Sequence, residues 1–191
     1  FSTVPKQMTV MSEQGSQEET EVDTEELLVG FLSNYDFLHE YRLQKLAYAA
    51  ELLHAEESND NIPLVGVGFK PYMYGSYSES VAETLDGIGG REDVVVRPDF
   101  RHGERTEAYR FTEEGDTDDL PQHAENIVDR LHEATKSATN EELAEWSKES
   151  WLYCEAEYDE PMDFEEYGQK VDDDEIDSDI EAAFPEAKSS D

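Results

Sequence analysis

Basic side chains are scarce in this sequence. Its 191 residues include 14 Lys and Arg against 49 Asp and Glu, which gives a formal charge of −35. Self-repulsion of this size opposes compaction in dilute buffer, whereas molar salt shortens the screening length to about 3 Å. Because the carboxylates are spread over the whole chain, we interpret the acidity as solvation in a salt-rich, halophilic cytoplasm. A nucleic-acid mimic or an acidic interaction protein is the alternative.

Cysteine and long apolar runs are also missing. Cys154 is the only cysteine, which excludes an internal disulfide and favours a reducing compartment. No stretch approaches the ~18 consecutive apolar residues of a membrane span, and the sequence shows no signal-peptide core. We therefore expect a cytoplasmic protein that makes no membrane contact.

Motifs for catalysis, cofactors and metals are absent as well. The segments "GVGFKP" and "GIGGRE" lack the spacing of dinucleotide and phosphate loops, and "YGSYS" does not match a nucleophile elbow. Cys154 has no second sulfur with which to bind zinc, and His123 and His132 are expected on different helix faces. The acidic run "DDDEIDSD" lacks the glycine of a calcium loop. We expect no enzymatic activity, no cofactor and no metal site.

The chain divides into three segments by composition. Residues 1–22 are polar and aperiodic, so we expect them to be disordered. Residues 23–154 carry periodic apolar positions and are predicted to form one domain with C-terminal helices. Residues 155–191 hold 16 acidic residues against two lysines, which predicts an acidic, largely disordered tail with a short helix near residues 180–184.

Periodicity within the domain predicts helices and one β-hairpin. A first helix starts at Asp23 or Thr24, and the segment "RLQKLAYAAELLHAEE" reads as an amphipathic second helix. An aromatic, β-leaning segment, "FKPYMYGSYS", leads into a third helix capped by Ser76 or Ser78. Residues 93–112 read as a hairpin in which Pro98 favours an edge strand. Two more helices follow, near residue 121 and after "ATNEEL", which contains a capping box.

This order predicts an α+β, mainly helical fold. Three helices would pack as a winged helix-turn-helix-like core, the hairpin at residues 93–112 would form its wing, and additional C-terminal helices would complete the domain. Fold alone does not establish function.

The segments "RLQKLAYAAELL" and "FKPYMYGSYSESVAETLDGI" resemble those of the YwgA-like family of small prokaryotic proteins. More remotely, they resemble the Panacea domain of antitoxins and SocA-related proteolytic adaptors. The resemblance covers about residues 25–115, and Ser76 stands where the family usually has proline. It implies a winged-helix-like, non-enzymatic domain associated with regulation, mobile elements or toxin control. The matching positions are Leu43, Gln44, Lys45, Leu46, Tyr48, Phe69, Tyr72, Tyr74, Gly75, Tyr77, Ser78 and Val81.

Three tyrosines give the aromatic turn two interpretations. Tyr72, Tyr74 and Tyr77 can bury their rings while their hydroxyls reach partners or water. They either hold the second helix against the third or line a groove for a partner protein.

The hairpin is the part of the chain best suited to DNA. Residues 91–110 carry five arginines against five carboxylates in a strongly acidic protein, and arginine is well suited to phosphate. Pairing of these arginines with carboxylates across the strands is the alternative, and both interpretations stay open. The candidate DNA-binding residues are Arg91, Arg97, Arg101, His102 and Arg105.

Two functions therefore follow from the sequence. The leading hypothesis is a DNA-binding regulator that uses the wing and forms a homodimer through its C-terminal helices, where Trp146 and Trp151 lie on several sides of one helix. The alternative is an antitoxin or adaptor-like module that binds a protein, such as a toxin or a protease component, without DNA contact. Glu79, Glu83 and Asp86 on the third helix favour the alternative, because carboxylates repel phosphates.

Overall fold

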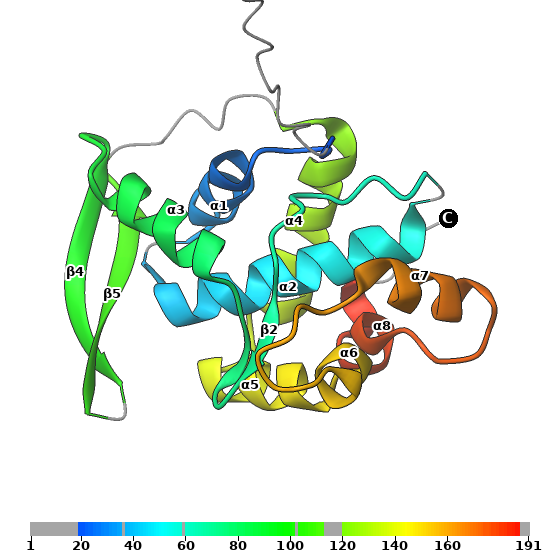
Figure 1. Cartoon of the computed structure of the whole chain (residues 1–191). Coiled ribbons are helices and arrows are strands. Elements are labelled where there is room, and N and C mark those ends of the chain that lie inside the picture. Colours follow the sequence, from blue (N-terminus) through cyan, green and yellow to red (C-terminus); the bar gives the residue numbers. More distant parts are fainter. Residues whose placement is uncertain (1–18, 36, 59, 102, 113–119, 188–191) are drawn as a thin grey trace, which may run out of the picture.

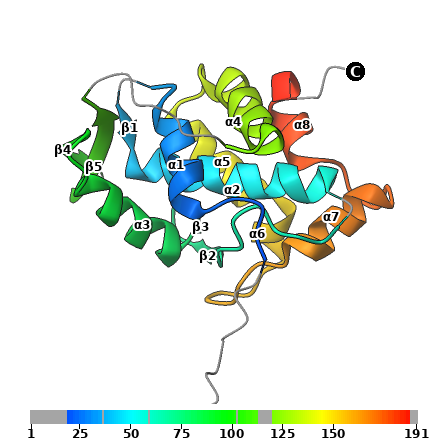
Figure 2. The ribbon, with the colours of Figure 1, turned by 90° about the horizontal axis from the view of Figure 1, so that it is seen from above.

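The chain folds as a mainly helical α+β protein. The computed structural model describes residues 19–35, 37–58, 60–101, 103–112 and 120–187. The helices are α1 (Thr24–Leu32), α2 (Glu40–Glu57), α3 (Glu79–Gly89), α4 (Gln122–Thr135), α5 (Asn140–Glu149), α6 (Trp151–Glu155), α7 (Phe164–Asp172) and α8 (Asp179–Ala183), followed by the 3-10 turn η1 (Pro185–Ala187). The strands are β1 (Leu38–His39), β2 (Lys70–Tyr72), β3 (Gly75–Tyr77), β4 (Val94–Arg101) and β5 (Glu104–Phe111). Helix α2 crosses the centre, with the β4–β5 hairpin toward one end of the protein and α7 toward the other (Figures 1 and 2).

Three helix starts confirm the predicted caps. Asp23 accepts a hydrogen bond from the Glu25 N–H group and completes a capping box with Glu26. Thr139 accepts from the Glu142 N–H group at 3.1 Å, and the Glu142 carboxylate accepts from the Thr139 N–H group at 2.7 Å. Ser78, one of the two predicted alternatives, caps α3. Local side-chain chemistry thus sets these boundaries.

Helix α2 differs from the amphipathic helix that its apolar spacing predicts. Every residue from Arg42 to His54 is buried, because helices pack around it on several sides. Buried polar groups cost free energy unless they are hydrogen-bonded, and each polar side chain of this stretch bonds to the backbone of a neighbouring segment. The polar side chains of α2 therefore form hydrogen bonds to the backbone of neighbouring segments instead of facing solvent. These buried polar residues are Arg42, Gln44, Lys45, Glu51 and His54.

The predicted hairpin forms two strands of an antiparallel sheet with the order β1-β5-β4. Pro98 lies on β4 at the edge of this sheet, as predicted. The two-residue strand β1, which the sequence analysis did not predict, pairs Leu38 with Tyr109 and closes the other edge. Within the aromatic segment, β2 and β3 form a second, smaller hairpin.

The C-terminal part of the chain corrects the expectation of a largely disordered tail. Helix α7 packs against α2 with Tyr167 buried, and α8 begins where the short helix was expected. The Ser178 hydroxyl and the Tyr167 hydroxyl both donate to the carboxylate of Glu56 on α2. The apolar residues Tyr167 and Ile180 are fully buried. A few apolar side chains and one buried acceptor therefore anchor a segment whose composition is mostly acidic.

Two further predictions need correction. The predicted helix after Thr139 is broken at Ser150, which has extended backbone angles and separates α5 from α6. Of the N-terminal segment expected to be disordered, residues 1–18 lie outside the described residues. Val22 is buried, and its N–H group donates to the Leu64 carbonyl at 2.9 Å, so residues 19–22 pack against the loop after α2.

Candidate binding groove

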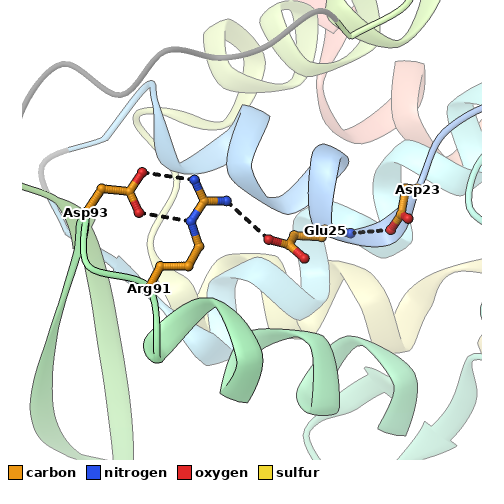
Figure 3. Close-up of polar contacts among 4 residues, drawn as sticks. All are labelled: Asp23, Glu25, Arg91 and Asp93. Atoms are coloured by element: carbon orange, nitrogen blue, oxygen red, sulfur yellow. Dashed lines mark hydrogen bonds and ion pairs between the residues drawn. The ribbon is translucent and has the colours of Figure 1, made fainter.

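The arginines predicted to bind DNA do not form one surface. Arg91 lies just before β4 and donates to both oxygens of Asp93 at 2.9 Å and to Glu25 at 3.1 Å (Figure 3). These bonds raise the pKa of Arg91, chiefly through Asp93, and lower the pKa of Asp93. Arg91 thus ties the end of α3 to α1.

Strand alternation separates the remaining arginines of the hairpin. Arg97 and Arg110 lie on one face of the sheet, where their guanidinium groups are 4.1 Å and 4.9 Å from the ring centre of Phe37. Arg105 pairs with Phe100 and lies on the opposite face. Arg101 ends β4, and His102 lies outside the described residues.

The predicted tyrosines do come together. The ring of Tyr72 lies 6.1 Å from the ring of Tyr74 and 5.6 Å from the ring of Tyr77, measured between centres. All three belong to the β2–β3 hairpin and its turn. The Tyr41 hydroxyl from α2 donates to the Tyr74 carbonyl at 3.2 Å, and the Tyr153 hydroxyl donates to the Tyr72 carbonyl at 2.7 Å.

Side chains of α2 connect the two segments that carry the family resemblance, "RLQKLAYAAELL" and "FKPYMYGSYSESVAETLDGI". The Gln44 amide donates to the Ser78 carbonyl at 2.9 Å and accepts from the Ser78 N–H group at 3.0 Å. The Lys45 ammonium donates to the Ser76 carbonyl at 2.8 Å. The "LQKL" helix thus fixes the backbone of the "YGSYS" segment.

Two small residues complete this attachment. Gly75 has φ of +106°, and a Cβ atom there would lie 2.9 Å from Cε of Lys45 and from Oγ of Ser147. The Ser76 N–H group donates to Oγ of Ser147 at 2.8 Å. Proline has no N–H group and could not make this bond, which gives a physical reason for serine at the position where the resembling family usually has proline.

A groove of about 340 Å³ lies between this hairpin and the tip of the β4–β5 hairpin. Exposed apolar side chains lie at or next to its lining residues, and we call them its rims: Tyr72 is 47% exposed, Met73, the next residue in the chain, is 68% exposed, and Phe100, the strand partner of Arg105, is 73% exposed. Phe100 pairs directly with Arg105, which lines the groove, and lies on the same face of the sheet. The lining residues are Glu40, Tyr41, Gln44, Lys45, Tyr72, Tyr74, Tyr77, Glu104, Arg105 and Thr106. We call this feature the tyrosine groove.

Burial and two nearby carboxylates act on Glu40 in the tyrosine groove. Burial raises the pKa of the Glu40 carboxyl, and the nearby carboxylates of Asp86 and Glu107 raise it further. Burial also raises the pKa of Tyr77, with Glu40 the next largest cause. The side chains of Glu79, Glu83 and Asp86 are exposed on α3, so the acidic face predicted for this helix is present.

Sequence reasoning did not connect Glu40, Tyr41 and Arg105 with the tyrosines. A signal was available for α2, because residues 40, 41, 44 and 45 recur at helical spacing and therefore share one face. For Arg105 no local signal existed, since its position at the groove depends on the sheet register.

The other polar clusters hold the fold together. Nδ1 of His54 lies 2.8 Å from Nε2 of His123, and Nε2 of His54 donates to the Ile62 carbonyl at 2.6 Å. A cavity of about 1010 Å³ lies between α7 and the loop that follows α2. It is lined by Glu51, His54 and Glu56, and each of these side chains forms hydrogen bonds to another segment of the chain. In the described residues, no group of three His, Cys, Asp or Glu side chains is arranged to hold a metal ion.

The apolar surface of α5 and α6, which was expected to form a homodimer, packs against the C-terminal segment of the same chain. The Trp146 indole donates to the Asp179 carbonyl at 3.0 Å and its ring packs on Phe184, while Trp151 lies beside Tyr167. The C-terminal segment thus covers the broad apolar surface of α5 and α6, and the homodimer stays a prediction.

Among the described helices, none is both long and apolar enough to cross a membrane. Comparison with protein-family models, curated proteins and solved structures gave no match. The resemblance to the YwgA-like family and the Panacea domain therefore stays a prediction.

Proposed function

We propose that this chain is a non-enzymatic regulatory module that holds a segment of a partner protein in the tyrosine groove. Of the two functions expected from the sequence, this is the antitoxin or adaptor-like one. The observation that carries it is the distribution of exposed apolar side chains. Of the four large ones among the described residues, Tyr72 lines the groove, Met73 follows it in the chain, and Phe100 pairs with the groove-lining Arg105, while Tyr158 is the fourth. Concentrated exposed apolar surface marks protein-binding sites.

The scaffold of this module is, in our proposal, a winged helix. The chain order α1-β1-α2-α3-β4-β5, with the first strand paired to the last, supports it. The β2–β3 hairpin is then an insertion between the second and third helices, and α4 to α8 are additions. The cytoplasmic location expected from the single cysteine stays a prediction.

Selection of random linear peptides against the protein in ~2 M KCl tests the proposed function. Peptides selected on the wild type should bind weakly to a Met73→Ser/Phe100→Ser variant, because that variant removes apolar contacts from both rims. Tyr158→Ser is the matched control and should bind as the wild type does. If no peptide is enriched, or if the rim variant binds all peptides equally well, the groove is not a protein-binding site.

DNA binding through the wing is the second candidate. In the described part of the chain the exposed Arg105 has no ion-pair partner, and Arg97 and Arg110 are exposed on the opposite face. The acidic face of α3 counts against it, because a winged helix places that helix in the major groove. Fluorescence anisotropy in ~2 M KCl with promoter and random duplexes tests this candidate. Promoter-selective binding that is lost in Arg101→Ala/Arg105→Ala would favour it over the peptide-binding function.

A further inference from the structure

Glu40 is the starting point for identifying what the tyrosine groove accepts. It lies in the first turn of α2, is half-buried, and lines the groove together with Tyr72, Tyr74 and Tyr77. Within the described part of the chain, its carboxylate forms no ion pair with a Lys, Arg or His side chain. A partly buried carboxylate without a cation is costly, and this cost is relieved when a cation binds beside it.

The two cations that line the groove do not neutralise this carboxylate. The Lys45 ammonium is buried, donates to the Ser76 carbonyl at 2.8 Å, and lies 4.8 Å from the ring centre of Tyr41. Arg105 is exposed on the other wall. The charged groups with the largest effect on Glu40 are instead Asp86 and Glu107, both negative. Glu40, without an ion pair in the described residues and with two carboxylates nearby, can therefore accept a positive group from a partner.

The tyrosine rings beside Glu40 suit the same kind of ligand. Tyr72, Tyr74 and Tyr77 form one cluster, with ring centres 5.6 Å and 6.1 Å apart. The face of an aromatic ring attracts cations, and several rings around an anionic group form an environment in which a desolvated cation is stabilised. Such contacts operate at short range, so they are less weakened by salt than long-range charge attraction.

We propose that the tyrosine groove binds an arginine or lysine side chain of the partner, with its positive charge between Glu40 and the tyrosine rings. The exposed apolar rims formed by Met73 and Phe100 contact the flanking residues of the partner. This inference rests on the proposed function, since it names the part of the partner that the groove recognises.

The test uses the peptides whose binding depends on the rims of the groove. Each arginine in them is replaced by citrulline, which is nearly isosteric, and each lysine by the larger acetyl-lysine; both replacements remove the charge. One replacement per peptide should weaken binding by about tenfold or more. In the Glu40→Gln variant the charged and neutral peptides should bind with nearly equal affinity. Glu83→Gln, which changes an exposed carboxylate on α3 outside the groove, should retain the preference for the charged peptide.

Loss of stability in the Glu40→Gln variant is not expected to explain its change in peptide binding. Because burial and like charges disfavour the charged form of Glu40, Glu40→Gln should unfold at equal or higher denaturant concentration than the wild type. If rim-dependent peptides bind equally well after every neutral replacement, the cation inference is wrong and the proposed function stands. If no rim-dependent peptide is obtained at all, the proposed function itself fails.

Discussion

The two hairpins beside the tyrosine groove are attached to the protein in different ways. The β2–β3 hairpin is fixed by side chains that bond directly to its backbone, namely Gln44 and Lys45 from α2 and Ser147 from α5. The β4–β5 hairpin is held by strand pairing and by apolar packing at its base, where Val94 and Tyr109 are buried, while Phe100 near its tip is exposed. On the β4–β5 hairpin, Nδ1 of His39 on β1 lies 2.9 Å from Oδ2 of Asp99. The groove therefore has one wall fixed by side-chain bonds to its backbone and one wall held mainly through strand pairing and side-chain contacts.

The largest expected difference concerns one glycine from each hairpin. Gly75 and Gly103 both have positive φ, +106° and +81°. A Cβ atom at Gly75 would crowd Lys45 and Ser147, whereas a Cβ atom at Gly103 meets nothing within 4 Å. Backbone strain alone costs about 1–2 kcal/mol, and overpacking adds about 1–3 kcal/mol. We expect Gly75→Ala to lower the free energy of unfolding by about 3 kcal/mol and Gly103→Ala by about 1 kcal/mol.

Denaturant unfolding of both variants in the same high-salt buffer measures this difference. Equal losses of stability in the two variants would show that the β2–β3 hairpin is not fixed more firmly than the β4–β5 hairpin.

A smaller effect is expected at Gln44, which supplies the paired bonds to the third helix. Gln44→Met keeps the side-chain length and leaves the buried Ser78 N–H group without a partner, while the Ser78 carbonyl still accepts from the Ala82 N–H group. An unsatisfied buried donor costs about 2 kcal/mol. Gln122→Met is the control, because Gln122 is exposed on α4 and its amide donates to the neighbouring Asn126 on the same helix. Similar unfolding midpoints for the two variants would show that the hydrogen bonds from Gln44 to the Ser78 backbone do not stabilise the protein.

This comparison also explains what the sequence could predict. Caps such as Asp23 and Thr139 and the hairpin with Pro98 at its edge follow from local chemistry, and all were predicted. The burial of α2 on all sides was not, because it depends on segments that are distant in the sequence, such as Thr135 and Ser178. The tyrosines of the groove were predicted as one of two alternatives. The opposite wall could not be predicted, because strand register decides which face Arg105 occupies.

The C-terminal segment is attached to α2 in a third way, through hydrogen bonds to the carboxylate of Glu56, which can titrate. Burial raises the pKa of Glu56 to about 7, despite hydrogen bonds from Tyr167 and Ser178 that lower it. Burial also raises the pKa of Asp179 on α8. The folded protein thus binds a proton at Glu56 more tightly than the unfolded chain does. Protonation of Glu56 therefore adds to the free energy of unfolding below about pH 4.5, and this contribution is lost as the pH rises through about 7.

Glu56→Gln should remove most of this pH dependence. Between about pH 5 and pH 8 in constant high salt, the free energy of unfolding of the wild type should fall by on the order of 1 kcal/mol more than that of the variant. By contrast, the bonds from Gln44 and Ser147 to the β2–β3 segment come from side chains without a titratable group in this range. Parallel pH profiles for wild type and variant would mean that Glu56 does not set the strength of the C-terminal attachment.

The smallest expected effect lies on the outer face of the β4–β5 hairpin. Arg97 and Arg110 both lie over the ring of Phe37, and exposed cation–π contacts stabilise by about 0.5–1 kcal/mol each. A double-mutant cycle with Arg97→Met and Phe37→Leu should give a coupling energy of about 0.5 kcal/mol that persists in high salt. The same cycle with Arg105→Met should give no coupling, because Arg105 lies on the opposite face. Coupling of Phe37 to Arg105 as strong as to Arg97 would contradict the register that places Arg105 in the tyrosine groove.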